Sequence, residues 1–380
     1  MSSQAIYLDS AASTAIDPRV TESMIRALSH CGNPHAQHHT HGALASSMVR
    51  QARSHVASAI GASPDEIVFT SGATEANNLA VLGLCSKLRS SGKTHIVVGA
   101  VEHSSVLEPL RASSAYSVSV IAPKPCGMID ASMIEPHLTD QTGLVCLQAV
   151  NNEVGTIQPV SEVAELLHKR NIFLHCDAAQ ALGKISFNVR ASGVDFATIS
   201  SHKFHGPPGI GALYIRKELS STLLPQLFGG GQEQGLRSGT LSTPLCVGFG
   251  TACELLDNDN ARLWSLRQRF LKALAPLAPT TYEHKDPAWQ VPGIISLRFH
   301  SIDQETLVMG LPKLSFGTGA ACRSRGTTYS HVISAIAGEA ASRETIRISL
   351  SRMSSEHEVD TASEMIAQFV QSVRKLKEVA

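Results

Sequence analysis

Ser200-Ser201-His202-Lys203-Phe204-His205-Gly206-Pro207-Pro208-Gly209-Ile210-Gly211 lies near the middle of a chain of 380 residues. The apolar run 194–199 leads into this segment, and its second half is rich in glycine and proline. The pattern predicts a buried strand that ends in a tight turn, with Lys203 at its tip. A lysine removed from water has a lowered pKa, and its neutral amine can form a Schiff base with an aldehyde. A structural ion pair would also bury a lysine, so the segment alone leaves both roles open.

Short apolar runs alternate with helical patterns on both sides of this segment, from about residue 65 to residue 255. The runs are apolar on both faces, which is typical of strands buried in a parallel sheet between helices. The expected strands are 67–70, 96–101, 118–121, 144–150, 172–176, 196–200 and 211–215, and the expected helices are 74–89, 104–112 and 160–170. Upstream, a four-residue spacing indicates a helix packed by one face, formed by Leu44, Met48, Ala52, Val56 and Ile60.

The chain changes character from about residue 257 onward. The patterns there predict helices at 261–275, 305–310 and 355–379 and strands at 294–299 and 345–350. They indicate a smaller α+β domain, completed by the N-terminal residues. We therefore expect a large domain over residues 15–256 and a small domain over residues 1–14 and 257–380.

The charge balance argues against polyanionic partners. The chain has 32 basic and 32 acidic residues and no long run of one sign. Direct nucleic-acid binding and attachment to anionic membranes are therefore not expected. No apolar run approaches the roughly 20 residues that cross a bilayer, and the first residues lack the features of a signal peptide. The sequence predicts a cytoplasmic protein.

The eight cysteines include no C-x-x-C pair, so a structural metal site is not expected. Seven of them are interpreted as small buried apolar side chains. Cys322 differs because it lies in a polar stretch, 317–326, with Arg323 and Arg325 close by. Nearby cations lower the pKa of a thiol and so favour the reactive thiolate. An ordinary surface thiol would have the same surroundings.

Two further strand ends carry residues suited to a charged ligand, at the edge where α/β sheets place their ligands. The segment 69–77 leads from a strand through small residues into a helix, whose first N–H groups can bind phosphate. Serine and threonine there can equally be simple helix caps. Asp177 follows another strand and is either a helix cap or the anionic partner of a pyridinium nitrogen.

Two more strand ends carry a histidine and amides. His103 can stack on an aromatic cofactor and move protons near neutral pH, or it can make a structural hydrogen bond. Asn151 and Asn152 offer amides to a polar ligand or form a turn. A lysine amine, a phosphate site, an anion for a ring nitrogen, a histidine and amide donors together match the needs of pyridoxal phosphate (PLP).

On these residues the chain resembles the fold-type I, class V PLP enzymes, and within them the NifS/IscS-type cysteine desulfurases. The resemblance covers nearly the whole chain. It implies an α/β, fold-type I PLP-transferase-like large domain with a mixed, mostly parallel sheet, and a smaller α+β domain. The matching motifs are Ile6-Tyr7-Leu8-Asp9, Gly32-Asn33-Pro34, Phe69-Thr70-Ser71-Gly72-Ala73-Thr74-Glu75, Val150-Asn151-Asn152-Glu153, Ser200-Ser201-His202-Lys203, Gly229-Gly230-Gly231-Gln232-Glu233, Arg237-Ser238-Gly239-Thr240 and Ile346-Arg347-Ile348-Ser349-Leu350.

The resemblance also implies roles for single residues. Lys203 would form the Schiff base with PLP, His103 would stack on the ring as acid and base, and Cys322 would be the nucleophile. Asp177 would pair with the pyridine nitrogen, and Gln180 would bond the phenolic oxygen. The phosphate would be held by Ala73, Thr74, Ser200 and His202, with Thr240 arriving from the second subunit of a homodimer. The substrate carboxylate would be received by Asn33 and Arg347, with Asn152 close to both ring and substrate.

The implied activity is a PLP-dependent cysteine desulfurase. It would convert L-cysteine to L-alanine and leave a persulfide on Cys322, within a loop at about 315–330, for transfer to an acceptor protein. Iron–sulfur assembly, tRNA thiolation and DNA phosphorothioation are the destinations considered. A selenocysteine lyase, another class V PLP lyase and a catalytically silent scaffold of the same fold are the alternatives.

Two departures from the family pattern bear on this. Well-known members read Ser-Ser-Gly-Ser-Ala-Cys-Thr-Ser around the nucleophile, whereas this chain reads Phe316-Gly317-Thr318-Gly319-Ala320-Ala321-Cys322-Arg323. The sequence also ends soon after the last predicted helix, where members that serve the iron–sulfur scaffold carry a docking extension. We therefore expect a dedicated acceptor.

Overall fold

The computed structural model describes residues 5–114, 116–257, 259–319 and 329–379. Its largest sheet has seven strands in the order β2-β8-β7-β6-β5-β3-β4. β8 runs antiparallel to both of its neighbours and the other pairs are parallel, which confirms the mixed, mostly parallel sheet. The strands are β2 (Ile67–Thr70), β3 (His95–Gly99), β4 (Ser117–Ile121), β5 (Thr142–Cys146), β6 (Phe173–Asp177), β7 (Phe196–Ser200) and β8 (Gly211–Ile215).

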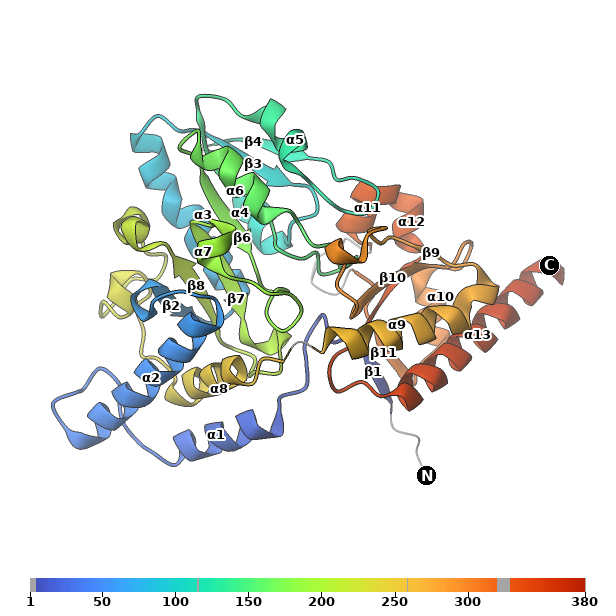
Figure 1. Cartoon of the computed structure of the whole chain (residues 1–380), viewed down its shortest axis with the longest axis horizontal. Coiled ribbons are helices and arrows are strands. Elements are labelled where there is room, and N and C mark those ends of the chain that lie inside the picture. The colour runs from blue at the N-terminus through green and yellow to red at the C-terminus, as the bar shows by residue number, and fades with distance from the viewer. Residues whose placement is uncertain (1–4, 115, 258, 320–328, 380) are drawn as a thin grey trace.

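Helices cover both faces of this sheet and bury its apolar side chains (Figure 1). One face packs against α3 (Ala73–Ser90) and α4 (Ser104–Ala112). The opposite face packs against α1 (Pro18–Leu28), α2 (Thr40–Ala59), α5 (Ala131–Ile134), α6 (Val160–His168), α7 (Val189–Ser192) and α8 (Thr243–Glu254). Burial on two sides explains why the central strands read as continuous apolar runs.

The face that α2 buries was predicted wrongly at its N-terminal end. Ala45, Val49, Ala52 and Val56 are buried, whereas Leu44 is 41% exposed. A helix turns about 100° per residue, so a strict four-residue spacing drifts by about 40° at each step and leaves the buried face. The edge strand β4 also differs from expectation, because only its last residue is buried.

The cysteine prediction also needs a correction. Cys146, Cys176, Cys246 and Cys253 are buried as expected, but Cys31 is exposed. It lies in the segment between α1 and α2, outside every regular element. The prediction of burial was therefore wrong for Cys31, because a small side chain in a polar connecting segment need not pack into a core.

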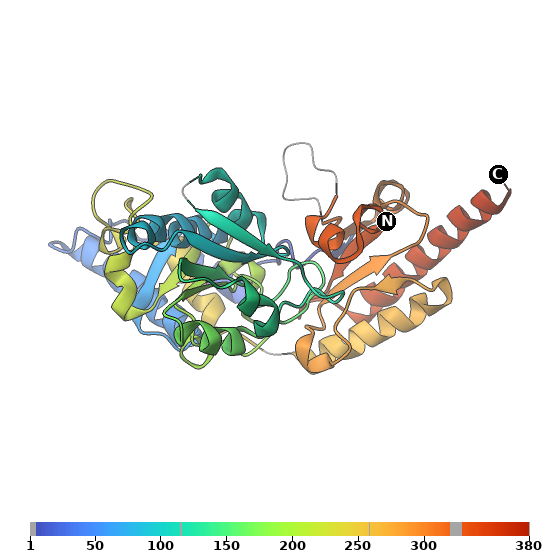
Figure 2. The same cartoon turned by 90° about the horizontal axis from the view of Figure 1, so that it is seen from above.

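A smaller part lies beside the large sheet and has its own hydrophobic core, drawn from Leu8 and from residues between 263 and 370 (Figure 2). Its antiparallel sheet has the order β12-β10-β9, and β1 pairs in parallel with β11. The elements are β1 (Ile6–Leu8), α9 (Asn260–Leu274), β9 (Thr280–Thr281), β10 (Ile294–Arg298), α10 (Gln304–Gly310), β11 (Leu314–Phe316), α11 (His331–Ala337), α12 (Glu339–Arg343), β12 (Thr345–Ser349) and α13 (Glu356–Val379). Leu8 belongs to this core and β1 pairs with β11, so the N-terminal strand packs in the smaller part. The domain bounds expected from the sequence, 15–256 and 1–14 with 257–380, stay a prediction.

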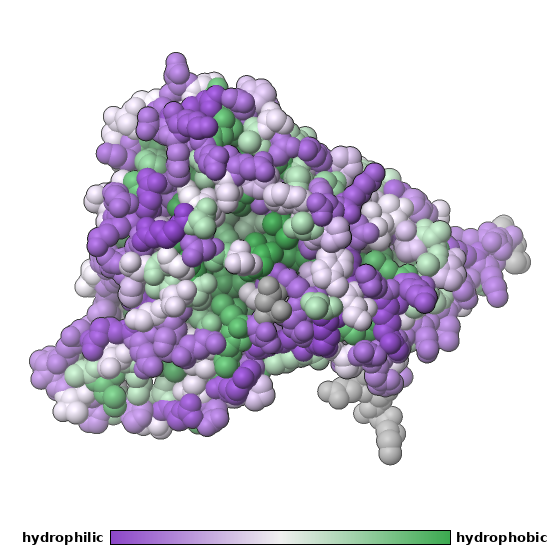
Figure 3. Space-filling view, viewed as in Figure 1, coloured by the Kyte–Doolittle hydropathy of each residue, from purple (hydrophilic) through white to green (hydrophobic). Residues whose placement is uncertain are grey.

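The surface is polar around a central group of apolar side chains. Apolar side chains gather near the middle of the face shown in Figure 3, and hydrophilic side chains surround them. No helix within the described ranges is long and apolar enough to cross a membrane.

Candidate active site

A cavity of about 400 Å³ lies where the large sheet meets the small part. This volume is within the range of roughly 300–1,000 Å³ typical of cofactor sites. The parallel strands point their carboxyl ends at it, as α/β sheets do toward their ligands. Its walls contain ten of the residues expected from the sequence: Ala73, Thr74, His103, Asn152, Asp177, Gln180, Ser200, His202, Lys203 and Arg347.

Lys203 follows β7 in a short 3₁₀ turn, Ser201–Lys203, as the sequence predicted. Its Nζ donates to the backbone oxygens of Ala11 (2.9 Å) and Ala12 (2.8 Å). The amine is therefore held by the segment that follows β1, while its side chain lines the cavity. A half-buried amine held by two carbonyl groups is well placed to receive an aldehyde.

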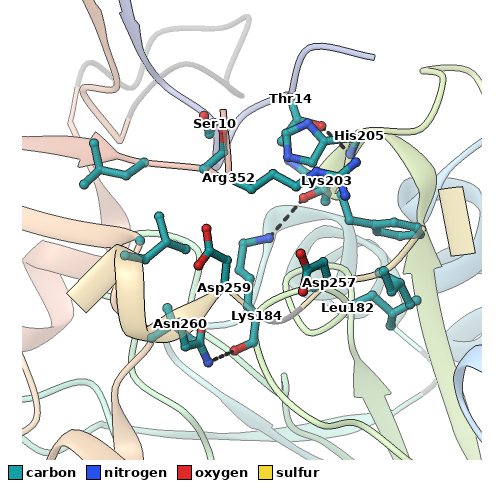
Figure 4. Close-up of a pocket in the computed structure, with 18 of the residues that line it drawn as sticks. Ser10, Thr14, Leu182, Lys184, Lys203, His205, Asp257, Asp259, Asn260 and Arg352 are labelled. Carbon is teal, nitrogen blue, oxygen red and sulfur yellow. Dashed lines mark hydrogen bonds between the residues drawn. The ribbon is translucent and has the colours of Figure 1, made fainter. Parts of the chain in front are cut away.

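A second lysine, Lys184, lies behind the Lys203 loop in a smaller cavity (Figure 4). Its Nζ donates to the backbone oxygen of Lys203 (3.1 Å), and Asn260 donates to the backbone oxygen of Lys184 (3.0 Å). Burial, with a smaller contribution from the charge of Lys203, lowers the pKa of Lys184 to about 7. The sequence gave no sign of this lysine, because nothing in its local pattern shows that it reaches the Lys203 loop.

The phosphate end of the site is formed by the start of α3. No side chain caps this helix, and a Cβ added at Gly72, its N-cap, would meet no atom within 4 Å. The residues of the first turn line the cavity, so N–H groups without a capping side chain and the positive end of the helix dipole face it. This end of the cavity fits a phosphate group.

His202 lines the same cavity. Burial is the main reason that its pKa is lowered to about 4, and the charges of Lys203 and Lys184 act in the same direction. At neutral pH the ring is therefore uncharged, and it can serve a phosphate group as a hydrogen-bond donor rather than as a cation.

Asp177 ends β6 and is only 6% exposed. Its Oδ1 accepts the N–H of Ala179 (3.0 Å), and its Oδ2 accepts from Nδ2 of Asn77 (2.8 Å). Within the described part of the chain it forms no ion pair with a lysine, arginine or histidine. A buried carboxylate without a cation is costly, and a pyridinium nitrogen would supply the missing charge.

The titratable groups next to Asp177 are uncharged at neutral pH. Burial raises the pKa of Glu102 to about 8, against the hydrogen bond from the N–H of Gln148. Burial also lowers the pKa of His175 to about 4. The carboxyl group of Asp177 is thus the acidic partner that remains for a ligand cation in this cavity.

Gln180 supplies amide groups beside Lys203. Its Nε2 donates to the backbone oxygen of Ala11 (2.8 Å), which is also an acceptor for Lys203. Its Oε1 is buried and has no hydrogen-bond partner among the residues that the structure describes. Buried polar atoms are rarely left unpaired, so the orphan oxygen is a further sign that a polar ligand completes the site.

His103 is the N-cap of α4 and is tied to Asp177 through two residues that the sequence did not single out. Its Nδ1 accepts the N–H of Ser105 (3.1 Å) and lies 2.7 Å from Oγ of Ser105. The fully buried Asn77 donates from Nδ2 to both Ser105 Oγ (2.8 Å) and Asp177 Oδ2 (2.8 Å). Because Nδ1 is an acceptor, the proton of the neutral ring lies on Nε2.

Arg347 projects from β12 and is 7% exposed. Its Nη1 donates to the backbone oxygen of Asn152 (2.9 Å), and its Nη2 forms an ion pair with Oδ1 of Asp9 (2.7 Å). The guanidinium thus faces the cavity that holds Lys203 and Asp177. A fixed guanidinium is suited to bind a carboxylate.

Three predicted site residues do not line this cavity. Asn33 is exposed in the segment between α1 and α2, which lies away from the small part at the end of the large one (Figure 1). Thr240 is exposed. Cys322 lies outside the described residues. Gly319, which precedes it, lines the cavity, and Ser330, which follows it, donates to Oε2 of Glu153 in the cavity wall (2.5 Å).

Comparisons with known proteins identify the family of this chain. The aminotransferase class-V family model matches residues 6–361. Cysteine desulfurase IscS of Rickettsia typhi is 40% identical over 379 residues, which cover 98% of this chain and 92% of that protein. A solved structure of a NifS-like protein has a TM-score of 0.88 at 33% identity, covering 97% of this chain and 100% of that one. SspA in complex with cysteine has a TM-score of 0.81 at 36% identity, covering 90% and 98%.

Proposed function

Because this chain belongs to the class-V aminotransferase family, in which it is a PLP-dependent cysteine desulfurase, we propose that the cavity at Lys203 is its active site. The observation that carries the proposal is the buried carboxylate of Asp177. It has no cationic partner within the described residues and lines the same cavity as Lys203 and Arg347. A cation acceptor, an amine and a carboxylate receptor in one cavity match a pyridinium aldehyde and an amino acid.

Different residues of the cavity would bind different parts of PLP. Asp177 would hold the pyridine nitrogen, Gln180 the phenolic oxygen, and Lys203 the aldehyde carbon. The phosphate would rest on Ala73, Thr74, Ser200 and His202, completed by Thr240 of a second copy of the chain. Bound there, PLP supplies an electron sink for the carbon atoms of the substrate.

The substrate would be L-cysteine, the molecule bound by the related SspA. Arg347 would receive its carboxylate beside Asn152, whose backbone oxygen fixes one side of the guanidinium. Asn33, predicted for the same contact, does not line the cavity of this chain, so Arg347 and Asn152 carry the assignment here. His103 would exchange a proton at Nε2, because Ser105 occupies its Nδ1.

Cys322 would then take the sulfur atom. Its thiolate would attack the sulfur of the substrate, forming an S–S bond as the C–S bond breaks. The bonding pair would stay with the carbon, which gains a proton and leaves as alanine. The persulfide on Cys322 would pass its outer sulfur to an acceptor protein in iron–sulfur assembly, tRNA thiolation or DNA phosphorothioation.

The enzyme would act as a homodimer. Thr240 is exposed near a group of exposed apolar side chains in the same segment, at Leu224 (51%), Leu227 (43%) and Phe228 (84%). Clustered apolar exposure of this kind is typical of an interface. Light scattering should give twice the mass of the chain, and Phe228→Asp should shift the protein toward the monomer and weaken PLP binding.

The decisive experiment separates sulfur transfer from simple cleavage. The purified protein is incubated with one equivalent of L-cysteine, and its mass is measured without reductant. We expect one added sulfur atom on the peptide that contains Cys322, and none in Cys322→Ser or in Lys203→Ala, which should also lose the visible absorbance of bound PLP. Full alanine release by Cys322→Ser would instead identify a lyase, and a protein that takes up no PLP would identify a silent scaffold.

A further inference from the structure

The arginine assigned to the substrate carboxylate is held in place before any substrate arrives. Arg347 Nη2 pairs with Asp9 Oδ1 at 2.7 Å, and Arg347 Nη1 donates to the oxygen of Asn152 at 2.9 Å. The side chain of Arg347 is 8% exposed and that of Asp9 is 19% exposed. Because the pair is largely shielded from water, it is screened less by salt than a surface pair is.

The guanidinium nevertheless keeps donors for a ligand. Arginine has five N–H groups, and the two contacts above use two of them. Nε of Arg347 is buried and has no acceptor within the described ranges. Nε lies beside Gly317, where an added Cβ would be 3.0 Å away, so the donors left for a substrate carboxylate are the remaining N–H groups of Nη1 and Nη2. Asp9 therefore leaves part of the guanidinium open.

The ion pair is confined by the backbone around it. Gly317 pairs with Arg347 through two backbone hydrogen bonds (2.9 and 2.7 Å). A Cβ added at Gly317 would lie 2.8 Å from Nη2 of Arg347 and 3.0 Å from Oδ1 of Asp9. The guanidinium therefore has little space in which to turn. Its plane is set by Asp9, by the backbone oxygen of Asn152 and by the backbone of Gly317.

Asp9 belongs to the same short segment that holds Lys203. It follows β1 directly and bridges to Ser349 at the end of β12. Two and three residues later, the carbonyl groups of Ala11 and Ala12 accept from Lys203. The segment 9–12 thus fixes both the amine assigned to PLP and the guanidinium assigned to the substrate.

We propose that Asp9 is the positioning residue of the substrate-carboxylate site, holding Arg347 by Nη2 and neutralising its charge so that the site accepts one carboxylate and disfavours further anions. The inference rests on the proposed role of Arg347. Without Asp9 the guanidinium would be an uncompensated buried cation that attracts any small anion. With Asp9 present, an anion binds favourably only if its geometry matches the N–H groups of Arg347 that remain open.

Two substitutions separate the geometry from the charge. Asp9→Asn keeps an oxygen that can accept from Nη2 but removes the negative charge. Asp9→Ala removes both. Because Asp9 does not line the cavity wall and is not placed at the reacting atoms, kcat should change little in either variant, whereas KM and inhibition by anions should change.

The test measures alanine formation from L-cysteine by the holoenzyme, with inorganic sulfate as the competing anion. Asp9→Ala should raise KM about tenfold, because the guanidinium loses its orientation. Asp9→Asn should keep KM within about threefold of wild type and lower the inhibition constant of sulfate about fivefold, because the uncompensated cation attracts anions. Asp9→Glu keeps the negative charge and should therefore have the inhibition constant for sulfate of wild type.

A matched control is the ion pair of Arg298 with Glu344, which lies at the end of the same sheet. Its Nη2–Oε2 distance is 2.7 Å and its side chains are 23% and 21% exposed. Glu344→Gln removes a comparable charge from the small part and should leave both KM and sulfate inhibition unchanged. Thermal midpoints of all variants identify any general loss of folding.

The outcomes distinguish this inference from the proposed function. If Arg347→Ala leaves KM for L-cysteine unchanged, Arg347 is not the carboxylate receptor, and the proposed substrate assignment fails with this inference. If Arg347→Ala raises KM but the Asp9 variants behave like Glu344→Gln, only the role of Asp9 is overturned. Sulfate inhibition that is equal in Asp9→Asn and wild type also overturns it.

Discussion

Replacing Lys184 with methionine should change how the stability of this enzyme depends on pH. Lys184 lies in the cavity behind the Lys203 loop and donates to the backbone oxygen of Lys203 (Figure 4). Burial is the main cause that lowers its pKa from 10.5 to about 7, so the effect persists whether or not Lys203 is charged. Methionine fills similar space and has no proton to bind or release.

The sign follows from comparing the folded and unfolded chains. Below pH 7 Lys184 is charged in both states, and the folded state carries the cost of burying that charge. Between pH 7 and 10.5 the folded chain releases the proton while the unfolded chain keeps it, so this lysine contributes increasing stability as the pH rises. The change in pKa from 10.5 to about 7 corresponds to at most about 5 kcal/mol over this range.

The assay compares thermal midpoints of wild type and Lys184→Met holoenzyme at intervals from pH 7 to pH 9.5. At pH 7 we expect the thermal midpoint of the variant to equal or exceed that of wild type. As the pH rises, the midpoint of wild type should increase steadily relative to that of the variant. Lys377→Met is the control, because Lys377 also donates to a backbone oxygen, that of Ser301, but is exposed on α13. Parallel curves for wild type and Lys184→Met would refute the reasoning.

Three other predictions concern buried groups. Glu102→Gln should show the opposite pH dependence: the buried carboxyl keeps its proton up to about pH 8, so wild type should lose stability relative to the variant between pH 4.5 and 8 in thermal unfolding. Asn77→Ala should weaken PLP binding about tenfold in a visible absorbance titration, because Asp177 loses a hydrogen bond of about 1.5 kcal/mol or more. Val56→Ala should lower the free energy of unfolding by about 2 kcal/mol, and Leu44→Ala by less than about 0.5 kcal/mol, as measured by urea denaturation.

The positions at the strand ends could be predicted because a parallel sheet directs them to one edge. Lys203 after β7, Asp177 at the end of β6 and His103 after β3 come from separate strands, and the sheet order brings them into one cavity. Strand patterning is a local property of the sequence, so it survives errors of a few residues at the strand ends. The identity of the cavity residues therefore followed from local patterns and the family motifs.

The partners of these residues could not be predicted in the same way. Asn77 is 100 residues from Asp177 in the chain, and Lys184 reaches the backbone of a residue 19 positions away. Neither has a distinctive neighbourhood, because one lies within an ordinary helix and the other in a turn. Buried asparagines and lysines are identified only when the tertiary structure shows what they contact.

The ion pair of Asp9 and Arg347 shows why such partners matter for function. The two residues are 338 positions apart and meet because the N-terminal strand enters the small part beside β11 and bridges to the end of β12. Two and three residues after Asp9, the backbone oxygens of Ala11 and Ala12 accept hydrogen bonds from Lys203. A shift of this segment would move the amine and the guanidinium together, so the distance between the cofactor end and the carboxylate end of the site is set by residues 9–12. For an enzyme that must hold one small amino acid against one cofactor, residues 9–12 therefore link the position of Lys203 to that of Arg347.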